Sequence, residues 1–273
     1  MNGVDVADEE LSPGAGDSIA DDSDRDYVNS LARGLEVICA FTRSTPRMSL
    51  SDVARATAMT RATARRLLLT LVREGYAQQD GKYFSLRPKV LRLGYSALAS
   101  MNIWDVAQPI MNQLAATLKE SVFAAVLDGH DVVYVARANS DRLVSIGITI
   151  GSRAPAHAVS TGRVLLASRP EAELQQYLET VNLVKFTPNT VVSKVKLREL
   201  IEEARAGGWS IVDQELEVGL RSISVPIRNA EGHVVAALNV CCPSSRLTPE
   251  QMRNTVLAEL MTASQAITAG LQS

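Results

Sequence analysis

The chain has 273 residues, of which 46% are hydrophobic and 21% charged, an ordinary composition for a globular protein. No apolar run approaches the ~20 residues that a membrane span requires, and the acidic N-terminus lacks the pattern of a secretion signal, so we expect a cytoplasmic protein with no membrane partner. Three cysteines without metal-ligand spacing indicate reduced thiols, and we expect no metal and no cofactor.

Charge is segregated along the chain, although the net charge is only −2. Residues 1–24 carry eight acidic and no basic side chains, whereas residues 25–94 carry thirteen basic against five acidic ones. The acidic segment has no aromatic residue and mixes Gly, Ser and Pro, which predicts a disordered tail over residues 1–25. Because the excess positive charge lies in one segment, that segment can bind a polyanion in a chain that is nearly neutral as a whole.

Three helices are predicted in the basic segment. Residues 29–41 form the first, with four side chains on its buried side and Cys39 as a small core residue: Leu31, Leu35, Ile38 and Cys39. Ser49-Leu50-Ser51-Asp52 resembles a capping box and begins a second helix, which ends near residues 57–59. Thr60 can then cap a third helix over residues 60–73.

The third helix has two different sides. Its core stripe has the spacing i, i+3, i+4 and i+7 and consists of Ala64, Leu67, Leu68 and Leu71. The opposite side carries guanidinium and hydroxyl groups, which suit phosphates and base edges, although a solvated basic face is a common alternative. Leu69 lies on that side too, where we expect it to pack against a neighbouring hairpin or a thymine methyl.

A hairpin follows this helix. Gly75 ends the helix as a left-handed cap, and β-prone residues 76–79 and 82–86 flank Asp80-Gly81, which predicts a type I′ turn with positive φ at both residues. Two helices joined by a tight turn and followed by a hairpin predict a winged helix-turn-helix over residues 26–87. We therefore expect double-stranded DNA as a partner, although a solvated lysine at the hairpin is an equally good interpretation of Lys82. The expected DNA contacts are Thr60, Arg61, Thr63, Arg65, Arg66 and Lys82.

A second domain is expected after a linker helix. Pro88 fits the first turn of a helix over residues 88–104, which we expect to contribute to dimerisation, and residues 105–273 form the second domain. There, residues 122–127 and 132–136 flank an Asp-Gly turn, and alternation predicts a strand over residues 144–150. Further helices are predicted at residues 160–168, from Pro170, over residues 197–204 and from Pro249, and further strands at residues 209–212, 222–227 and 234–240. Hairpins in place of crossovers predict an α+β domain with an antiparallel sheet.

The second domain carries no catalytic fingerprint. Zinc-protease, phosphate-loop, nucleophile-elbow and dinucleotide motifs do not occur, and His130, His157 and His233 are dispersed. Cys241 with His157 and Asp213 could form a thiol triad, but nothing in the spacing requires one, so we do not expect an enzyme.

The start of the helix predicted at residues 160–168 could form an anion-binding site. Ser160-Thr161-Gly162-Arg163 could aim backbone N–H groups, hydroxyls and a guanidinium at a carboxylate. The alternative, favoured on these residues alone, is an ordinary N-cap with a surface arginine.

Both domains resemble the IclR (isocitrate-lyase-regulator) family of bacterial transcription factors, from about Asp26 to Leu271. The resemblance lies in Leu50-Ser51-Asp52-Val53-Ala54, Arg61-Ala62-Thr63-Ala64-Arg65-Arg66-Leu67-Leu68, Gly75-Tyr76, Gly151-Ser152-Arg153-Ala154-Pro155-Ala156-His157 and Asp213-Gln214-Glu215-Leu216-Glu217-Val218-Gly219-Leu220-Arg221-Ser222-Ile223. Residues 80–84, 162–167 and 212–217 look most like the subgroup that controls aromatic-acid breakdown through the β-ketoadipate pathway. Effectors of the protocatechuate, 4-hydroxybenzoate or β-ketoadipate type are implied.

The resemblance also implies a GAF-like effector-binding fold, promoter DNA as partner and a homodimer or homotetramer. It implies a pocket for a small organic acid at the helix start after His157 and at strand ends, which favours effector binding over the simple cap. The implied effector-binding residues are Ser160, Thr161, Gly162, Arg163, Asp213, Ser222, Asn239 and Cys241. The alternatives are a regulator of another carbon-source pathway, such as glyoxylate or another organic acid, a ligand-converting enzyme with an appended DNA-binding module, and an architectural nucleic-acid-binding protein.

Overall fold

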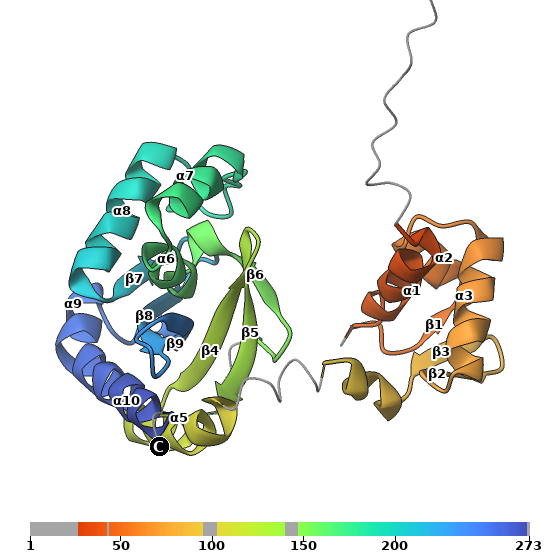
Figure 1. Cartoon of the computed structure of the whole chain (residues 1–273), viewed down its shortest axis with the longest axis horizontal. Coiled ribbons are helices and arrows are strands. Elements are labelled where there is room, and N and C mark those ends of the chain that lie inside the picture. The colour runs from red at the N-terminus through yellow and green to blue at the C-terminus, as the bar shows by residue number, and fades with distance from the viewer. Residues whose placement is uncertain (1–26, 43, 95–102, 140–146, 272–273) are drawn as a thin grey trace, which may run out of the picture. The chain divides into compact units, whose positions relative to one another are not determined.

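The computed structural model describes residues 27–42, 44–94, 103–139 and 147–271 (Figure 1). The chain divides into two compact units, Met1–Gly94 and Tyr95–Ser273. The expected acidic tail, residues 1–25, and residues 95–102 of the expected linker helix lie outside the described residues.

The N-terminal unit contains the predicted helix-turn-helix and hairpin. Its elements are α1 (Asn29–Cys39), β1 (Met48–Ser49), α2 (Leu50–Ala56), α3 (Arg61–Arg73), β2 (Ala77–Asp80), β3 (Tyr83–Leu86) and the 3-10 helix η2 (Pro88–Val90). α2 begins with the predicted capping box, in which the side chains of Ser49 and Asp52 each accept a hydrogen bond from the other residue's backbone N–H. Thr60 caps α3 by accepting a hydrogen bond from the Thr63 N–H at 3.2 Å. The predictions for the second and third helices are therefore confirmed.

The hairpin belongs to a three-stranded sheet of order β1-β3-β2. Strand β1 was not predicted, because two residues carry no periodicity. The predicted turn is also wrong: Asp80 pairs with Tyr83, so the turn residues are Gly81 and Lys82. Of these two, only Gly81 has a positive φ, 57°, whereas a type I′ turn needs a positive φ at both. The shift places Lys82 at the tip of the hairpin.

A small core holds this unit together. Its buried residues are Val37, Met48, Val53, Ala54, Met59, Ala64, Leu68 and Phe84. In α3, Ala64 and Leu68 are fully buried and Leu67 and Leu71 pack against the same core, which confirms the predicted stripe. Because these four residues occupy one side of α3, its other side is left to solvent.

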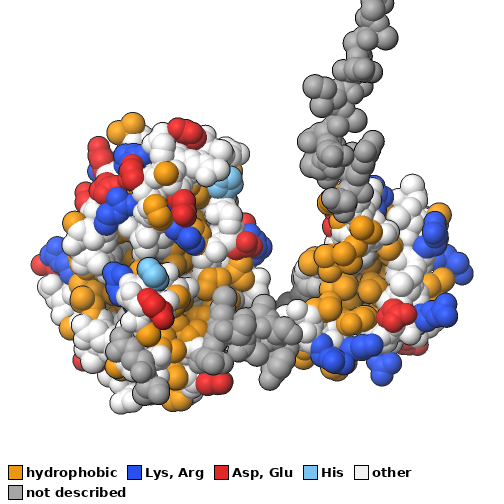
Figure 2. Space-filling model, in the orientation of Figure 1, with side chains coloured by type: hydrophobic (Ala, Val, Ile, Leu, Met, Phe, Trp, Pro, Cys, Tyr) orange, Lys and Arg blue, Asp and Glu red, His pale blue; other side chains and the backbone are white. Residues whose placement is uncertain are grey.

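The predicted buried side of α1 is wrong. Val37 is the buried residue of this helix, whereas Leu31 and Leu35 are 63% and 48% exposed and Cys39 is exposed. The helix packs on the core through Val37, which lies off the predicted stripe. An apolar surface over α1 remains within this unit, as Figure 2 shows.

The C-terminal unit is built on a six-stranded antiparallel sheet of order β6-β5-β4-β9-β8-β7. Its strands are β4 (Ser121–Asp128), β5 (Asp131–Ala138), β6 (Arg153–Pro155), β7 (Ser210–Asp213), β8 (Leu220–Arg228) and β9 (Val234–Pro243). The predicted α+β class and antiparallel sheet are confirmed.

Helices cover both faces of this sheet (Figure 1). They are α5 (Ile103–Leu118), the 3-10 helix η3 (Ala156–Ala158), α6 (Ser160–Ala167), α7 (Glu171–Thr180), α8 (Lys194–Gly207), α9 (Pro249–Gln251), the π-helical turn η4 (Met252–Val256) and α10 (Leu257–Gly270). One core lies between the sheet and α5 and α10, and a second lies between the sheet and α6, α7 and α8. Because side chains alternate along a strand, β8 sends Ile223 and Val225 into the first core and Ser222 and Ser224 toward α6.

Two features of this unit differ from the sequence expectation. α5 was not predicted, because Pro109 within it interrupts the local helix signal. The strand expected over residues 144–150 falls partly on residues 140–146, which are not described, and residues 147–150 form a bend and turn, not a strand. Within the described residues, no helix is both long and apolar enough to cross a membrane.

Candidate functional site

The exposed side of α3 carries the predicted DNA-contact residues. Thr60, Arg61, Arg65 and Arg66 are exposed and Thr63 is half-buried. Among the described residues, no carboxylate forms an ion pair with Arg61, Arg65 or Arg66. Their positive charge is therefore not neutralised within the unit, and Figure 2 shows Lys and Arg side chains gathered on this unit. Such a surface suits the negative potential of a nucleic acid backbone.

The tip of the hairpin adds a second cationic group of residues. The Lys82 ammonium lies 5.3 Å and the Arg47 guanidinium 4.7 Å from the centre of the Tyr83 ring, so both cations pack against one aromatic ring. Arg47 is also ion-paired with Asp80. The sequence did not identify Arg47, because its place beside the hairpin depends on the pairing of β1 with β3.

In the C-terminal unit, α6 is buried along its whole length and brings together a cluster of polar side chains. The Ser160 hydroxyl lies 2.8 Å from the Ser222 hydroxyl and 2.7 Å from the Ser224 hydroxyl. Asn239 donates from Nδ2 to Ser160 at 3.1 Å and to Ser224 at 3.0 Å. Three predicted residues thus meet, and Ser224, which was missed, completes the cluster. Ser224 could have been predicted from the sequence, because it lies two residues after Ser222 and therefore on the same face of the strand.

A small cavity lies beside this cluster. Its volume is about 20 Å³, which is room for about one water molecule. The residues that line it are Tyr134, Ile148, Ala158, Val159, Val212, Glu215, Leu216, Glu217, Leu220, Ser222, Asn239 and Cys241. Ser222 and Cys241 face each other across β8 and β9, which places both on the cavity side of the sheet.

The first turn of α6 contributes two further predicted residues in different ways. The Thr161 hydroxyl is fully buried beside Tyr134, and a hydrogen bond between these two side chains lowers the pKa of Tyr134 against the effect of burial. A Cβ on Gly162 would lie 2.1 Å from the Ala156 carbonyl oxygen. Gly162 is therefore required for the close approach of η3 to α6. The alternative of an ordinary side-chain N-cap is wrong, because Val159 is the N-cap residue and no side chain caps the helix.

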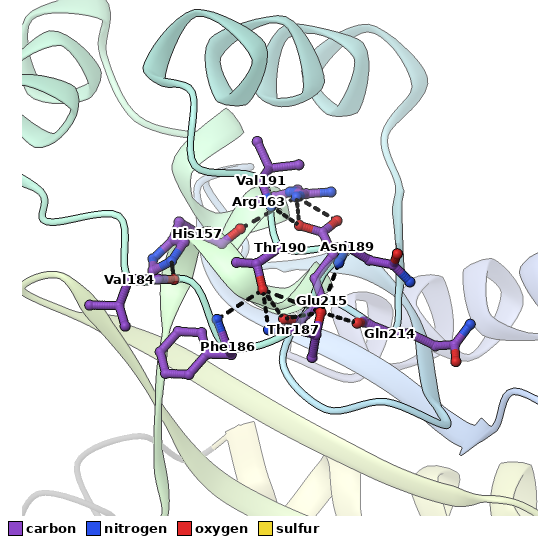
Figure 3. A network of polar contacts seen from close by, with 10 residues as sticks. All are labelled: His157, Arg163, Val184, Phe186, Thr187, Asn189, Thr190, Val191, Gln214 and Glu215. Carbon is purple, nitrogen blue, oxygen red and sulfur yellow. Dashed lines mark hydrogen bonds and ion pairs between the residues drawn. The ribbon is translucent and has the colours of Figure 1, made fainter.

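Arg163 is the most important difference from the sequence expectation. It was expected to bind the effector, but it is buried and its Nη2 donates to both carboxylate oxygens of Glu215, at 2.8 and 2.7 Å (Figure 3). The same carboxylate accepts a hydrogen bond from the Val191 N–H at 3.1 Å. The guanidinium is therefore paired within the protein, and Arg163 does not line the cavity. Sequence reasoning missed Glu215, because a partner 52 residues away has no local signal.

Asp213 also has a protein partner. Its carboxylate accepts from the Arg221 guanidinium at 2.8 Å, across the β7–β8 pair, and its side chain is 36% exposed. Asp213 does not line the cavity either. Of the eight predicted effector residues, Ser222, Asn239 and Cys241 line the cavity, and Ser160 contacts two of the cluster residues that surround it.

Burial controls the ionisation of the cavity residues. It raises the pKa of Tyr134 to about 12 and also raises the pKa of Cys241, so both groups are protonated at neutral pH. Burial lowers the pKa of His157, whose Nε2 lies 3.2 Å from the Val184 carbonyl oxygen. A protonated thiol is a poor nucleophile, and Asp213 is paired with Arg221, so the thiol triad considered from the sequence is not assembled.

A larger cleft, about 620 Å³, lies elsewhere on this unit, at the C-terminal ends of α6 and α8. One of its arginines, Arg205, donates to the backbone carbonyls of Ala167 and Arg169 and is ion-paired with Glu202. The lining of this cleft contains none of the predicted effector residues. Among the described residues, no group of three or more His, Cys, Asp or Glu could hold a metal ion.

Comparison with known proteins gives a family for both units. Residues 30–81 match the IclR helix-turn-helix domain, and residues 95–269 match the C-terminal domain of bacterial transcriptional regulator IclR. The chain is 42% identical over 243 residues to the Pca regulon regulatory protein of Pseudomonas putida, covering 89% of this chain and 84% of that protein.

Solved structures agree. A putative transcriptional regulator from Rhodococcus sp. RHA1 is 47% identical with a TM-score of 0.80, covering 90% of this chain and 98% of that one. An IclR homolog complexed with 4-hydroxybenzoate, from Microbacterium hydrocarbonoxydans, is 27% identical with a TM-score of 0.78, covering 89% and 99%. Two domains match in order over most of the chain. The chain therefore belongs to the IclR family of bacterial transcriptional regulators.

Proposed function

We propose that this protein binds a promoter operator as a homodimer or a dimer of dimers, with α3 in the major groove and the hairpin at the backbone. The observation that carries the proposal is the exposed side of α3, where three arginines have no acidic partner within the described residues. A dimer is proposed because one helix reads only a few base pairs, and two half-sites multiply the specificity. Binding to promoter DNA places the protein in the cytoplasm.

Individual roles follow from position on α3 and the hairpin. Arg61, Thr63 and Arg66 are proposed to contact bases or groups beside them, and Thr60, Arg65 and Lys82 to contact phosphates. The Thr63 hydroxyl lies 3.0 Å from the Thr60 hydroxyl. On binding DNA, the Thr63 hydroxyl is proposed to give up this hydrogen bond for one to the DNA.

We further propose that a small aromatic carboxylic acid is the effector and binds beside the cluster of Ser160, Thr161, Ser222, Asn239 and Cys241. Hydroxyl and amide groups next to apolar walls suit a ligand with one polar end and one flat apolar body. The 4-hydroxybenzoate complex of the structural relative supports this class of ligand. Arg163, Gly162 and Asp213 are proposed to shape the site without touching the acid, and the protein is proposed to bind its effector without converting it.

The test is a fluorescence anisotropy titration with promoter fragments from the gene neighbourhood. Wild type should bind one fragment, and Arg66→Ala should lose about 1–3 kcal/mol of binding free energy. Arg33→Ala on α1 is the matched control and should bind like wild type, because Arg33 lies on a different helix. Operator binding by Arg66→Ala equal to that of wild type would contradict the proposal.

A further inference from the structure

The proposed effector cavity is too small for an aromatic acid in this structure. At about 20 Å³ it holds roughly one water molecule, so an aromatic acid can enter only if part of its wall moves. Four of the lining residues belong to one short segment, residues 214–220: Glu215, Leu216, Glu217 and Leu220. Residues 214–219 form the turn between β7 and β8, and Leu220 is the first residue of β8, whereas most of the other lining residues lie on or beside sheet strands.

The turn at residues 214–220 closes on itself. The Gln214 N–H donates to the Leu220 carbonyl at 2.8 Å, and the Gly219 N–H donates to the Gln214 Oε1 at 3.0 Å. Left-handed backbone marks both ends, at Gln214 with φ 58° and at Gly219 with φ 89°. A compact loop whose ends meet can rotate about its end residues as one piece.

Hydrogen bonds from α6 and from residues 187–191 converge on two residues of this turn (Figure 3), and at its other end the Gly219 carbonyl accepts from the Ser244 N–H at 2.7 Å. The Glu215 carboxylate accepts from Arg163 at 2.8 and 2.7 Å and from the Val191 N–H. The backbone carbonyls of Gln214 and Glu215 accept from the hydroxyls of Thr187 and Thr190 at 2.7 and 2.6 Å. These bonds join the turn to α6 and to the loop that contains Thr187, Thr190 and Val191.

We propose that residues 214–220 form the gate of the effector cavity and that the Glu215–Arg163 ion pair is its latch. The inference rests on the proposed effector site. Because the closed state has to open before an acid can bind, the apparent affinity is reduced by the fraction of molecules that are open. The latch thus sets how much effector is needed for a response. Opening also releases Thr187 and Thr190, so the gate and their loop change state together.

The test substitution is Glu215→Gln, which keeps the size of the side chain and weakens the charged pair with Arg163. In the full chain, 4-hydroxybenzoate should bind about tenfold more tightly and associate faster, because more molecules are open before binding. Glu217→Gln is the matched control: it removes the same charge from the same turn and the same cavity wall, and Arg163 pairs with Glu215 instead. A charge effect on the bound acid would appear in both variants, whereas the latch predicts a gain in affinity for Glu215→Gln that exceeds any gain for Glu217→Gln.

Hydrogen exchange on the free protein gives an independent measurement. The Val191 and Gly219 amides should exchange faster in Glu215→Gln than in wild type and in Glu217→Gln. The Val191 N–H donates to the Glu215 carboxylate, of which the glutamine keeps only one acceptor oxygen, and the Gly219 N–H lies in the gate. If Glu215→Gln does not fold, Glu215→Gln combined with Arg163→Met leaves no unpaired buried charge and should show the same gains. Weaker binding with faster exchange would mean a structural role only and would overturn the gate.

The outcomes separate the two proposals. If wild type and all variants fail to bind aromatic acids while the exchange rates change as expected, the proposed effector is wrong and the gate is supported. If wild type binds 4-hydroxybenzoate and Glu215→Gln binds with unchanged affinity and rate, the gate is wrong and the effector site stands.

Discussion

At the scale of single residues, the proposed effector site depends on backbone contacts that leave no room for an added side chain. Gly162 lies at the start of α6, where its missing side chain lets the helix approach the Ala156 carbonyl. The residue types of this segment indicated an anion site, but Gly162 serves the backbone packing that holds Ser160 and Thr161 against the sheet.

Replacement of Gly162 by alanine should therefore destabilise the C-terminal unit. The added Cβ would lie 2.1 Å from a backbone oxygen, so the helix has to move, at a cost of about 1–3 kcal/mol. Gly34→Ala in α1 is the control and should raise the stability of its unit. Nothing lies within 4 Å of a Cβ added at Gly34, and alanine favours a helix. Thermal unfolding of the full chain measures both changes. A transition of the C-terminal unit unchanged by Gly162→Ala would show that η3 can move aside at no cost.

At the scale of elements, the sequence predicted what local signals specify. The limits of α2 and α3 followed from caps and periodicity, and the hairpin followed from glycine. The buried side of α1 did not, because a helix with several apolar stripes is oriented by its partner and not by its own sequence. β1 and Arg47 were missed for the same reason, since both depend on a pairing with β3. In the second unit, Glu215 was missed because its partner lies 52 residues away, whereas Ser224 could have been found from its place two residues after Ser222.

The hairpin provides a test of the proposed phosphate contacts. Lys82 is exposed at its tip and, within the described residues, has no acidic partner. Lys82→Ala should weaken binding equally on related operators and should lower the slope of log K against log salt by about 1. Arg47→Ala should have a smaller effect, because Arg47 is already ion-paired with Asp80. A slope unchanged in both variants across a salt series would place the hairpin away from the backbone.

At the scale of the whole molecule, the chain separates its two tasks. The positive charge lies in residues 25–94, and the polar cavity lies in the C-terminal unit. An effector can therefore act on operator binding only by preferring one of two states of the chain. Thermodynamic linkage then requires that the operator change the affinity for the effector by the same factor that the effector changes the affinity for the operator.

This reciprocity is the prediction for the full chain. 4-Hydroxybenzoate should change the operator Kd by about 5–150-fold, the usual range of such coupling, and operator DNA should change the Kd of the acid by the same factor in the same direction. Anisotropy titrations at zero and saturating acid measure the first factor, and calorimetry of the acid with and without a saturating operator duplex measures the second. A duplex of unrelated sequence is the control and should leave the Kd of the acid unchanged. An acid that binds tightly while both factors equal one would show that the cavity does not communicate with α3, because a ligand with equal affinity for both states shifts neither.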